Sequence, residues 1–115
     1  MSEEKDNLIV RLTIQFALDI IAYCEILEQQ RKFVVSGQLL KAGTSVGANV
    51  HEAQNAESRA DFIHKMKVAA KEANESEYWL ILCQLSPSYP DCEKLLADAR
   101  TILKVLSKII GSSKK

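Results

Sequence analysis

The sequence predicts an all-α protein, an antiparallel up-down-up-down four-helix bundle. Apolar residues recur at steps of three and four along four separate stretches, which is the spacing that lines one face of a helix. Short polar or proline-containing segments separate the stretches, so successive helices are expected to run in opposite directions. A chain of 115 residues is about the length of one domain. We expect a single domain over residues 1–115, with helices at about 8–28, 33–54, 59–85 and 91–110.

The first helix carries two apolar rows side by side. One row contains Ile9, Phe16 and Ile20, and the second lies next to it. A face this wide is covered by more than one neighbour, either inside the bundle or at a subunit contact. The polar break at residues 29–32 contains no glycine or proline, so a continuous bent helix is an alternative to the short antiparallel connection that we favour. The second row consists of Val10, Ile14, Ala17, Ile21 and Cys24.

The second helix contains Gly43 and Gly47 within its apolar pattern. Glycine in a helix interior costs about 1 kcal/mol relative to alanine, so two of them four residues apart suggest a close backbone contact. The third helix has small residues in the middle of its apolar row, and these would permit such an approach. We expect the glycines to pack against these small residues, Ala69, Ala73 and Ser76.

Polar side chains follow one flank of the second helix and continue on the third. Three interpretations are open, namely a buried hydrogen-bonded network, a solvated rim or a ligand site. A buried polar group without a partner costs about 1–3 kcal/mol, so burial would require partners. We favour the structural network. Its predicted members are Gln38, Ser45, Asn49, Glu52, Glu72 and Ser76.

The boundaries of the last two helices carry recognisable signals. Ser58 followed by Asp61 resembles a capping box, with an N-cap hydroxyl and a carboxylate three residues later. Pro87 and Pro90 end the third helix, because proline cannot continue it. Gly111 is expected to cap the fourth helix at its C-terminal end.

Composition excludes several classes of function. Fifteen basic and fifteen acidic residues cancel, so no overall field attracts nucleic acid or a membrane surface. The N-terminus lacks the pattern of a signal peptide, and no run approaches the roughly 18 to 20 apolar residues that span a bilayer. Three cysteines without a C-x-x-C pair are expected to be reduced and packed as small hydrophobic residues. These features together predict a cytoplasmic protein.

No catalytic, metal or cofactor site is predicted. A di-iron bundle needs two Glu-x-x-His pairs, and this chain has only two histidines. His51 and Glu52 match the start of a zinc-protease helix, but the second ligand position holds Asn55. No triad signature or phosphate-binding glycine loop is present, so we expect a protein that is not an enzyme.

The third helix carries a basic row opposite its apolar row. Lysine and histidine there can bind phosphates in a salt-sensitive manner, and a nearby tyrosine can stack on a base. The alternative is a solvated face, because Glu75 interrupts the row. Three further basic residues lie around the second helix. The candidate nucleic-acid-binding residues are His64, Lys67, Lys71 and Tyr78, with Arg31, Lys32 and Lys41.

Three segments resemble a known family. They are QLLKAGTSVGANVHE at residues 38–52, DFIHK at residues 61–65 and KEANESEYWL at residues 71–80. They look like the bacterial four-helix bundle proteins named after reading frames in 23S rRNA intervening sequences. That family is similar to the accessory variability determinant of diversity-generating retroelements. The match covers about half of the chain, and the first and fourth helices match only in pattern.

The resemblance implies a homopentameric ring of four-helix bundles with no established enzyme activity. For the retroelement relatives it implies binding of a reverse transcriptase and nucleic acid through a basic surface, whereas this chain is neutral. Our leading hypothesis is an oligomeric bundle that binds RNA or an RNA-associated protein. The alternatives are a protein-only scaffold that recruits a partner such as a reverse transcriptase, and an enzyme or metal protein built on the bundle.

Overall fold

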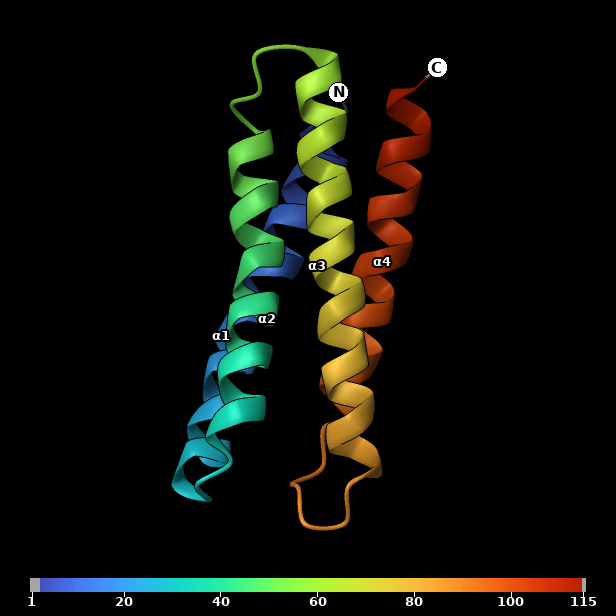
Figure 1. Cartoon of the computed structure of the whole chain (residues 1–115). Coiled ribbons are helices and arrows are strands. Elements are labelled where there is room, and N and C mark those ends of the chain that lie inside the picture. The colour runs from blue at the N-terminus through green and yellow to red at the C-terminus, as the bar shows by residue number, and fades with distance from the viewer. Residues whose placement is uncertain (1–2, 115) are drawn as a thin grey trace.

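The computed structural model describes residues 3–114 of the chain, and side chains for residues 8–114. Successive helices run in opposite directions (Figure 1), which confirms the predicted all-α bundle. The described part contains no strand. The four helices are α1 (Glu3–Gln29), α2 (Phe33–Ala53), α3 (Arg59–Leu85) and α4 (Glu93–Ser113).

The predicted helix boundaries hold best where turn signals are strong. α2 and α3 lie within one residue of their expected limits. α1 begins five residues earlier than predicted, because the prediction followed apolar periodicity and the preceding residues are mostly charged. The predicted cap at Gly111 is wrong, since α4 continues to Ser113 and Lys114 takes the cap position. A Cβ at Gly111 would meet no neighbouring side chain or helix within 4 Å, so packing does not require glycine at this position.

The helices stand at the corners of a square in the order α1, α2, α3, α4. Each packs on the next one along the chain, and α4 returns to α1. No Cα atoms of the diagonal pairs, α1 with α3 or α2 with α4, approach within 8 Å among the residues described. The α2–α3 contact is the most extensive and the α1–α4 contact the least. Each helix therefore has one face on the core and an opposite face outside the bundle.

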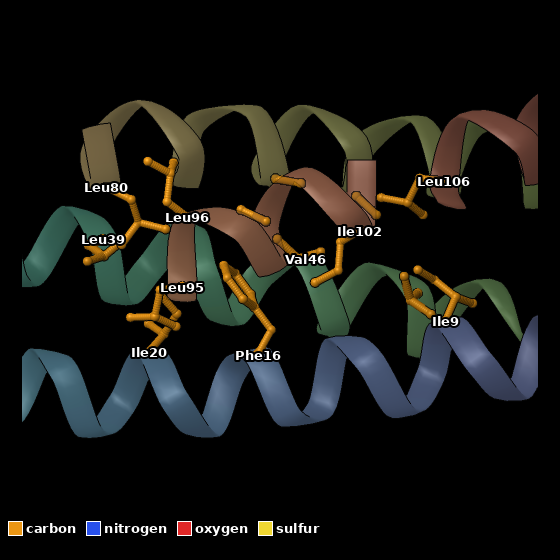
Figure 2. Close-up of a cluster of buried hydrophobic side chains, with 14 of the residues drawn as sticks. Ile9, Phe16, Ile20, Leu39, Val46, Leu80, Leu95, Leu96, Ile102 and Leu106 are labelled. Atoms are coloured by element: carbon orange, nitrogen blue, oxygen red, sulfur yellow. The ribbon is translucent and has the colours of Figure 1, made fainter. Parts of the chain in front are cut away.

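The core is built from one apolar row of each helix, as the periodicity predicted. Figure 2 shows Phe16 and Ile20 from α1 pointing toward α2 and α4, with Leu39 and Val46 on α2. The rows on α3 and α4 close the other side through residues such as Leu80. Burial of these side chains supplies the main stabilising term for the bundle. The largest fully buried side chains include Phe16, Ile9, Ile20, Leu27, Leu39, Met66, Leu80, Ile102 and Leu106.

The two glycines of α2 face α1 rather than α3, which corrects the expected partner. A Cβ at Gly43 would lie 2.8 Å from Cγ2 of Ile20, and one at Gly47 would lie 3.3 Å from the carbonyl oxygen of Thr13. The close approach was predicted correctly, but the glycines sit on the side of α2 that turns away from α3. The small residues of α3 are buried instead in the core row. Sequence spacing alone does not determine which of two neighbouring helices a small residue faces.

The α1–α2 connection is a tight turn, so the continuous bent helix is excluded. Arg31 has φ 63° and lies in the left-handed region, which is uncommon for a residue other than glycine. Its amide donates to the carbonyl of Glu28 at 2.9 Å, and the amide of Lys32 donates to that of Leu27 at 2.9 Å. These two bonds close the C-terminal end of α1 without the glycine that usually marks such an end.

The start of α3 is capped as predicted, with one difference. The hydroxyl of Ser58 accepts a hydrogen bond from the amide of Asp61 at 3.0 Å. The carboxylate of Asp61 accepts from the amide of Glu57 at 3.1 Å, one residue before the N-cap. The position of this carboxylate is also fixed by Lys65, whose Nζ lies 3.0 Å away.

Candidate nucleic-acid interface

His64, Lys67, Lys71 and Tyr78 lie together on the outer face of α3, and we call them the α3 row. All four are exposed, and Tyr78 is 55% exposed. They follow one another at steps of three, four and seven residues, opposite the buried row of the same helix. At 1.5 Å per residue the α3 row extends about 21 Å along the helix. The structure thus places these four predicted residues on one continuous surface.

The two lysines of the α3 row are available to a ligand. Neither Lys67 nor Lys71 forms an ion pair within the described part of the chain. Glu77, a carboxylate of the same helix, points to the other side and binds Arg100 of α4 at 2.9 Å. Glu75 is exposed near the row and lowers its positive potential. A phosphate approaching the row would therefore meet two unpaired ammonium groups and one carboxylate.

The ring of Tyr78 packs against the ring of a neighbouring aromatic residue. The rings of Tyr78 and Trp79 meet edge to face, with centroids 5.5 Å apart and planes inclined at 68°. Trp79 is half-buried against the core, and its Nε1 has no hydrogen-bond partner in the described structure. Such edge-to-face pairs are favourable, and this one leaves much of the Tyr78 ring open. An exposed ring held in this way can stack on a base.

The other three candidate basic residues do not gather at one place. Lys41 is exposed on α2, the helix beside α3. Arg31 and Lys32 lie in the α1–α2 turn, where Nζ of Lys32 is 4.8 Å from the ring centre of Tyr89. Tyr89 belongs to the α3–α4 connection, so this turn and the start of α3, near His64, lie at opposite ends of the bundle (Figure 1). The α3 row is therefore the coherent part of the predicted set.

Three of the six residues predicted to form a polar network donate to the backbone of their own helix. Oγ of Ser45 donates to the carbonyl of Lys41 at 2.6 Å, and Nδ2 of Asn49 donates to that of Ser45 at 2.8 Å. Oγ of Ser76 donates to the carbonyl of Glu72 at 2.8 Å. In the described structure, no hydrogen bond joins two of these six residues across helices. The structural role of the set therefore stays a prediction. Of the other three members of the set, Gln38 and Glu52 are exposed and Glu72 is half-buried.

Three buried thiols form a second cluster of chemically interesting groups. Cys83 and Cys92 lie beside the hydroxyl of Tyr23, which donates to the carbonyl of Pro90 at 2.7 Å. Burial raises the pKa of the Cys24 thiol, and also that of Cys92, to about 11. Burial likewise raises the pKa of Cys83 above its ordinary value. These thiols are protonated near neutral pH, and protonated thiols are poor nucleophiles.

These shifts predict a loss of stability at alkaline pH. The ordinary pKa of a cysteine is 9.0, and in the folded chain Cys24 and Cys92 have values of about 11. A folded pKa above the unfolded one means that stability is complete below pH 9 and falls as the pH rises toward 11. Each of these two thiols lowers the free energy of unfolding by up to about 1.4 kcal/mol per pH unit in that window.

Urea unfolding under reducing conditions, at a series of pH values from about 8 to about 10.5, measures this loss of stability over most of the window. Cys92→Ala serves as the control, because it should remove the contribution of one thiol and give a shallower pH dependence. A free energy of unfolding that stays constant across the window would contradict the prediction.

The outer face of α1 was only partly predicted. Its second apolar row divides in the structure: Cys24 is buried, whereas Ile14 and Ile21 are 54% and 40% exposed. Leu18, also 54% exposed, belongs to neither predicted row. It lies four residues after Ile14 and three before Ile21, and this spacing is the signal that could have identified it. Ile14, Leu18 and Ile21 form an apolar strip that no helix of the bundle covers.

Within the described part of the chain, no helix has the length and apolar character needed to span a membrane. Clusters of three or more histidine, cysteine or acidic side chains able to hold a metal ion are also absent there.

Comparison with known proteins identifies the family. The family model described as 23S rRNA-intervening sequence protein matches residues 5–108. A crystal structure of a protein of unknown function from the S23 ribosomal protein family of Bacteroides thetaiotaomicron is 43% identical, with a TM-score of 0.86. The match covers 93% of this chain and 98% of that one. No curated protein matches. The chain belongs to the 23S rRNA-intervening sequence protein family.

Proposed function

We propose that this protein is a non-catalytic, self-associating bundle of the cytoplasm that binds RNA through the α3 row. The observation that carries the proposal is the exposure of Lys67 and Lys71, unpaired, on the same face as the open ring of Tyr78. Ammonium groups bind phosphates and an exposed aromatic ring stacks on bases, which together suit a flexible or looped RNA. The family name also refers to 23S rRNA.

Self-association compensates for the small size of the α3 row. The chain has no net charge, so a single copy offers only a weak local site. Repetition of the row in several linked copies raises the effective affinity without new contacts. The family resemblance implies five copies in a ring. We therefore include a homopentamer in the proposal.

Charge reversal of the α3 row tests RNA binding. The double variant Lys67→Glu/Lys71→Glu is expected to lose the gel shift of a labelled stem-loop RNA and of an oligouridine. Two favourable phosphate contacts become two repulsive ones, while both positions are exposed and contribute little to packing. For the unchanged protein, the shift should weaken steeply as salt is added.

The matched control is Lys104→Glu/Lys108→Glu on the outer face of α4. These lysines are also exposed and four residues apart, so the total change in charge is the same. The control should retain the gel shift, and both variants should melt close to the unchanged protein. An unchanged shift for the α3 variant, or an equal loss for both pairs, would overturn the assignment of this face.

A protein-only scaffold is the second candidate function. The balance of fifteen basic and fifteen acidic residues favours it, because RNA-binding proteins usually carry excess positive charge. In this case the assembly would recruit a nucleic-acid enzyme such as a reverse transcriptase. A pull-down of a purified candidate enzyme that persists after nuclease treatment would support this function over RNA binding.

A further inference from the structure

The outermost residues of α1 form a regular seam that faces away from the bundle. Arg11, Ile14, Leu18, Ile21 and Glu25 follow one another at alternating steps of three and four, the spacing of a two-helix contact. We call these five residues the outer seam. All five are exposed, and the buried row of the same helix lies on the opposite side. The outer seam is therefore a second helix-packing face on a helix whose first face is already in the core.

The surface beside the outer seam permits close approach of another helix. Ala22 is exposed next to it, and Ala17 is half-buried on its other side. Three large aliphatic side chains in the middle of the seam are exposed by 40–54%. A contiguous apolar surface of this kind on a folded protein marks an interaction site. What it binds is decided by the charges at its two ends.

The two ends of the outer seam carry opposite charges. Arg11 and Glu25 are each seven residues from Leu18, one before it and one after it. Neither forms an ion pair with another residue that the structure describes. An antiparallel copy of the same seam, centred on Leu18, places each Arg11 opposite the partner's Glu25, and it does so twice. A parallel copy in the same register would place like charges together, which opposes association.

We propose that the outer seams of two copies of this chain pack antiparallel about a twofold axis at Leu18. The contact is self-complementary, so the same patch is used on both copies. Leu18 meets its own counterpart, Ile14 and Ile21 of the two copies interleave around it, and two ion pairs close the ends. This inference rests on the proposed self-association and adds a contact that is separate from the one that closes the ring. The contact alone joins two copies, and it would join two five-membered rings into an assembly of ten.

Cysteine cross-linking tests the direction of the contact. One tagged chain carries Arg11→Cys, a second carries Glu25→Cys, and the two are co-expressed and treated with a short bis-maleimide. The antiparallel contact predicts a cross-linked pair containing one chain of each kind, and no pair when either variant is expressed alone. Leu18→Cys alone should cross-link to itself. The unchanged chain is the background control, because its three cysteines are buried.

Light scattering on charge variants provides the second measurement. Arg11→Glu places two carboxylates opposite each other at each end of the contact. It should raise the dissociation constant of the contact by roughly tenfold or more. Arg11→Glu/Glu25→Arg exchanges the two charges and should restore the original mass. Leu18→Asp should weaken the contact, whereas Leu85→Asp, at a 75% exposed position on α3, should leave the mass unchanged.

The outcomes separate this inference from the proposed function. A stable assembly that gives no mixed cross-link, and is not restored by the charge exchange, would overturn the α1 contact and retain self-association. Cross-linking of Arg11→Cys chains with one another would show a parallel contact and also overturn it. A monomeric unchanged protein would overturn both self-association and this contact. RNA binding is measured independently by the gel shift.

Discussion

Replacing Phe16 with alanine is expected to lower the free energy of unfolding by about 3–5 kcal/mol. The Phe16 side chain is 1% exposed and points from α1 toward α2 and α4 (Figure 2). The substitution removes the transfer free energy of the ring and leaves a cavity that the surrounding helices fill only in part. Small domains are stable by about 5–15 kcal/mol, so this one change removes a large share of the total.

Urea unfolding followed by helical circular dichroism measures this effect. Phe33→Ala is the matched control, since Phe33 is 56% exposed at the start of α2 and its loss should change stability by about 0.5 kcal/mol or less. Equal losses for the two variants would show that the ring of Phe16 is not packed in the core as described.

Apolar periodicity predicted the fold because it records directly which side of each helix is buried. The seam of α3, with steps of four and three from Phe62 to Cys83, reappears residue for residue as its buried row. Boundaries were predicted where a side chain has a local structural role, as at Ser58. They were missed where the backbone adopts an unusual conformation without glycine, as at Arg31. Periodicity contains no information about such a turn.

The sequence could group only those candidate residues that lie on the same face of one helix. Residues on a single outer face, such as Lys67 and Lys71, can be grouped from their spacing alone, and the structure places them on one surface. Arg31 and Lys32 lie in a turn whose position depends on how the helices are arranged, so spacing could not place them. Leu18 was overlooked because it contributes to neither of the two rows that run along the rest of α1. Which surface residues lie together or stay uncovered depends on how the helices pack, and the periodicity of one helix does not specify that packing.

Replacing Gly43 with valine is expected to destabilise the bundle by about 3 kcal/mol. A Cβ at this position would lie 2.8 Å and 2.9 Å from the two γ carbons of Ile20, and 3.2 Å from its Cβ. The last of these atoms is attached directly to the α1 backbone, so rotation of the Ile20 side chain cannot relieve the clash. The branched side chain must therefore force α1 and α2 apart, which costs packing along their whole contact. The small gain in helix propensity over glycine, about 0.4 kcal/mol, does not offset this cost.

Gly37→Val isolates the packing term, because it makes the same chemical change on the same helix. No atom lies within 4 Å of a Cβ at Gly37, so only the propensity gain remains and stability should change by about 0.5 kcal/mol or less. Urea unfolding of both variants gives the cost of separating α1 from α2 as the difference between them. When Gly43→Val is combined with Ile20→Ala, the loss of stability should be smaller than the sum of the two single losses. The alanine removes the γ carbons that the valine would meet, so the two sites are coupled. Additive effects in this cycle would mean that Gly43 does not hold α2 against Ile20, and that its four-residue spacing to Gly47 has another cause.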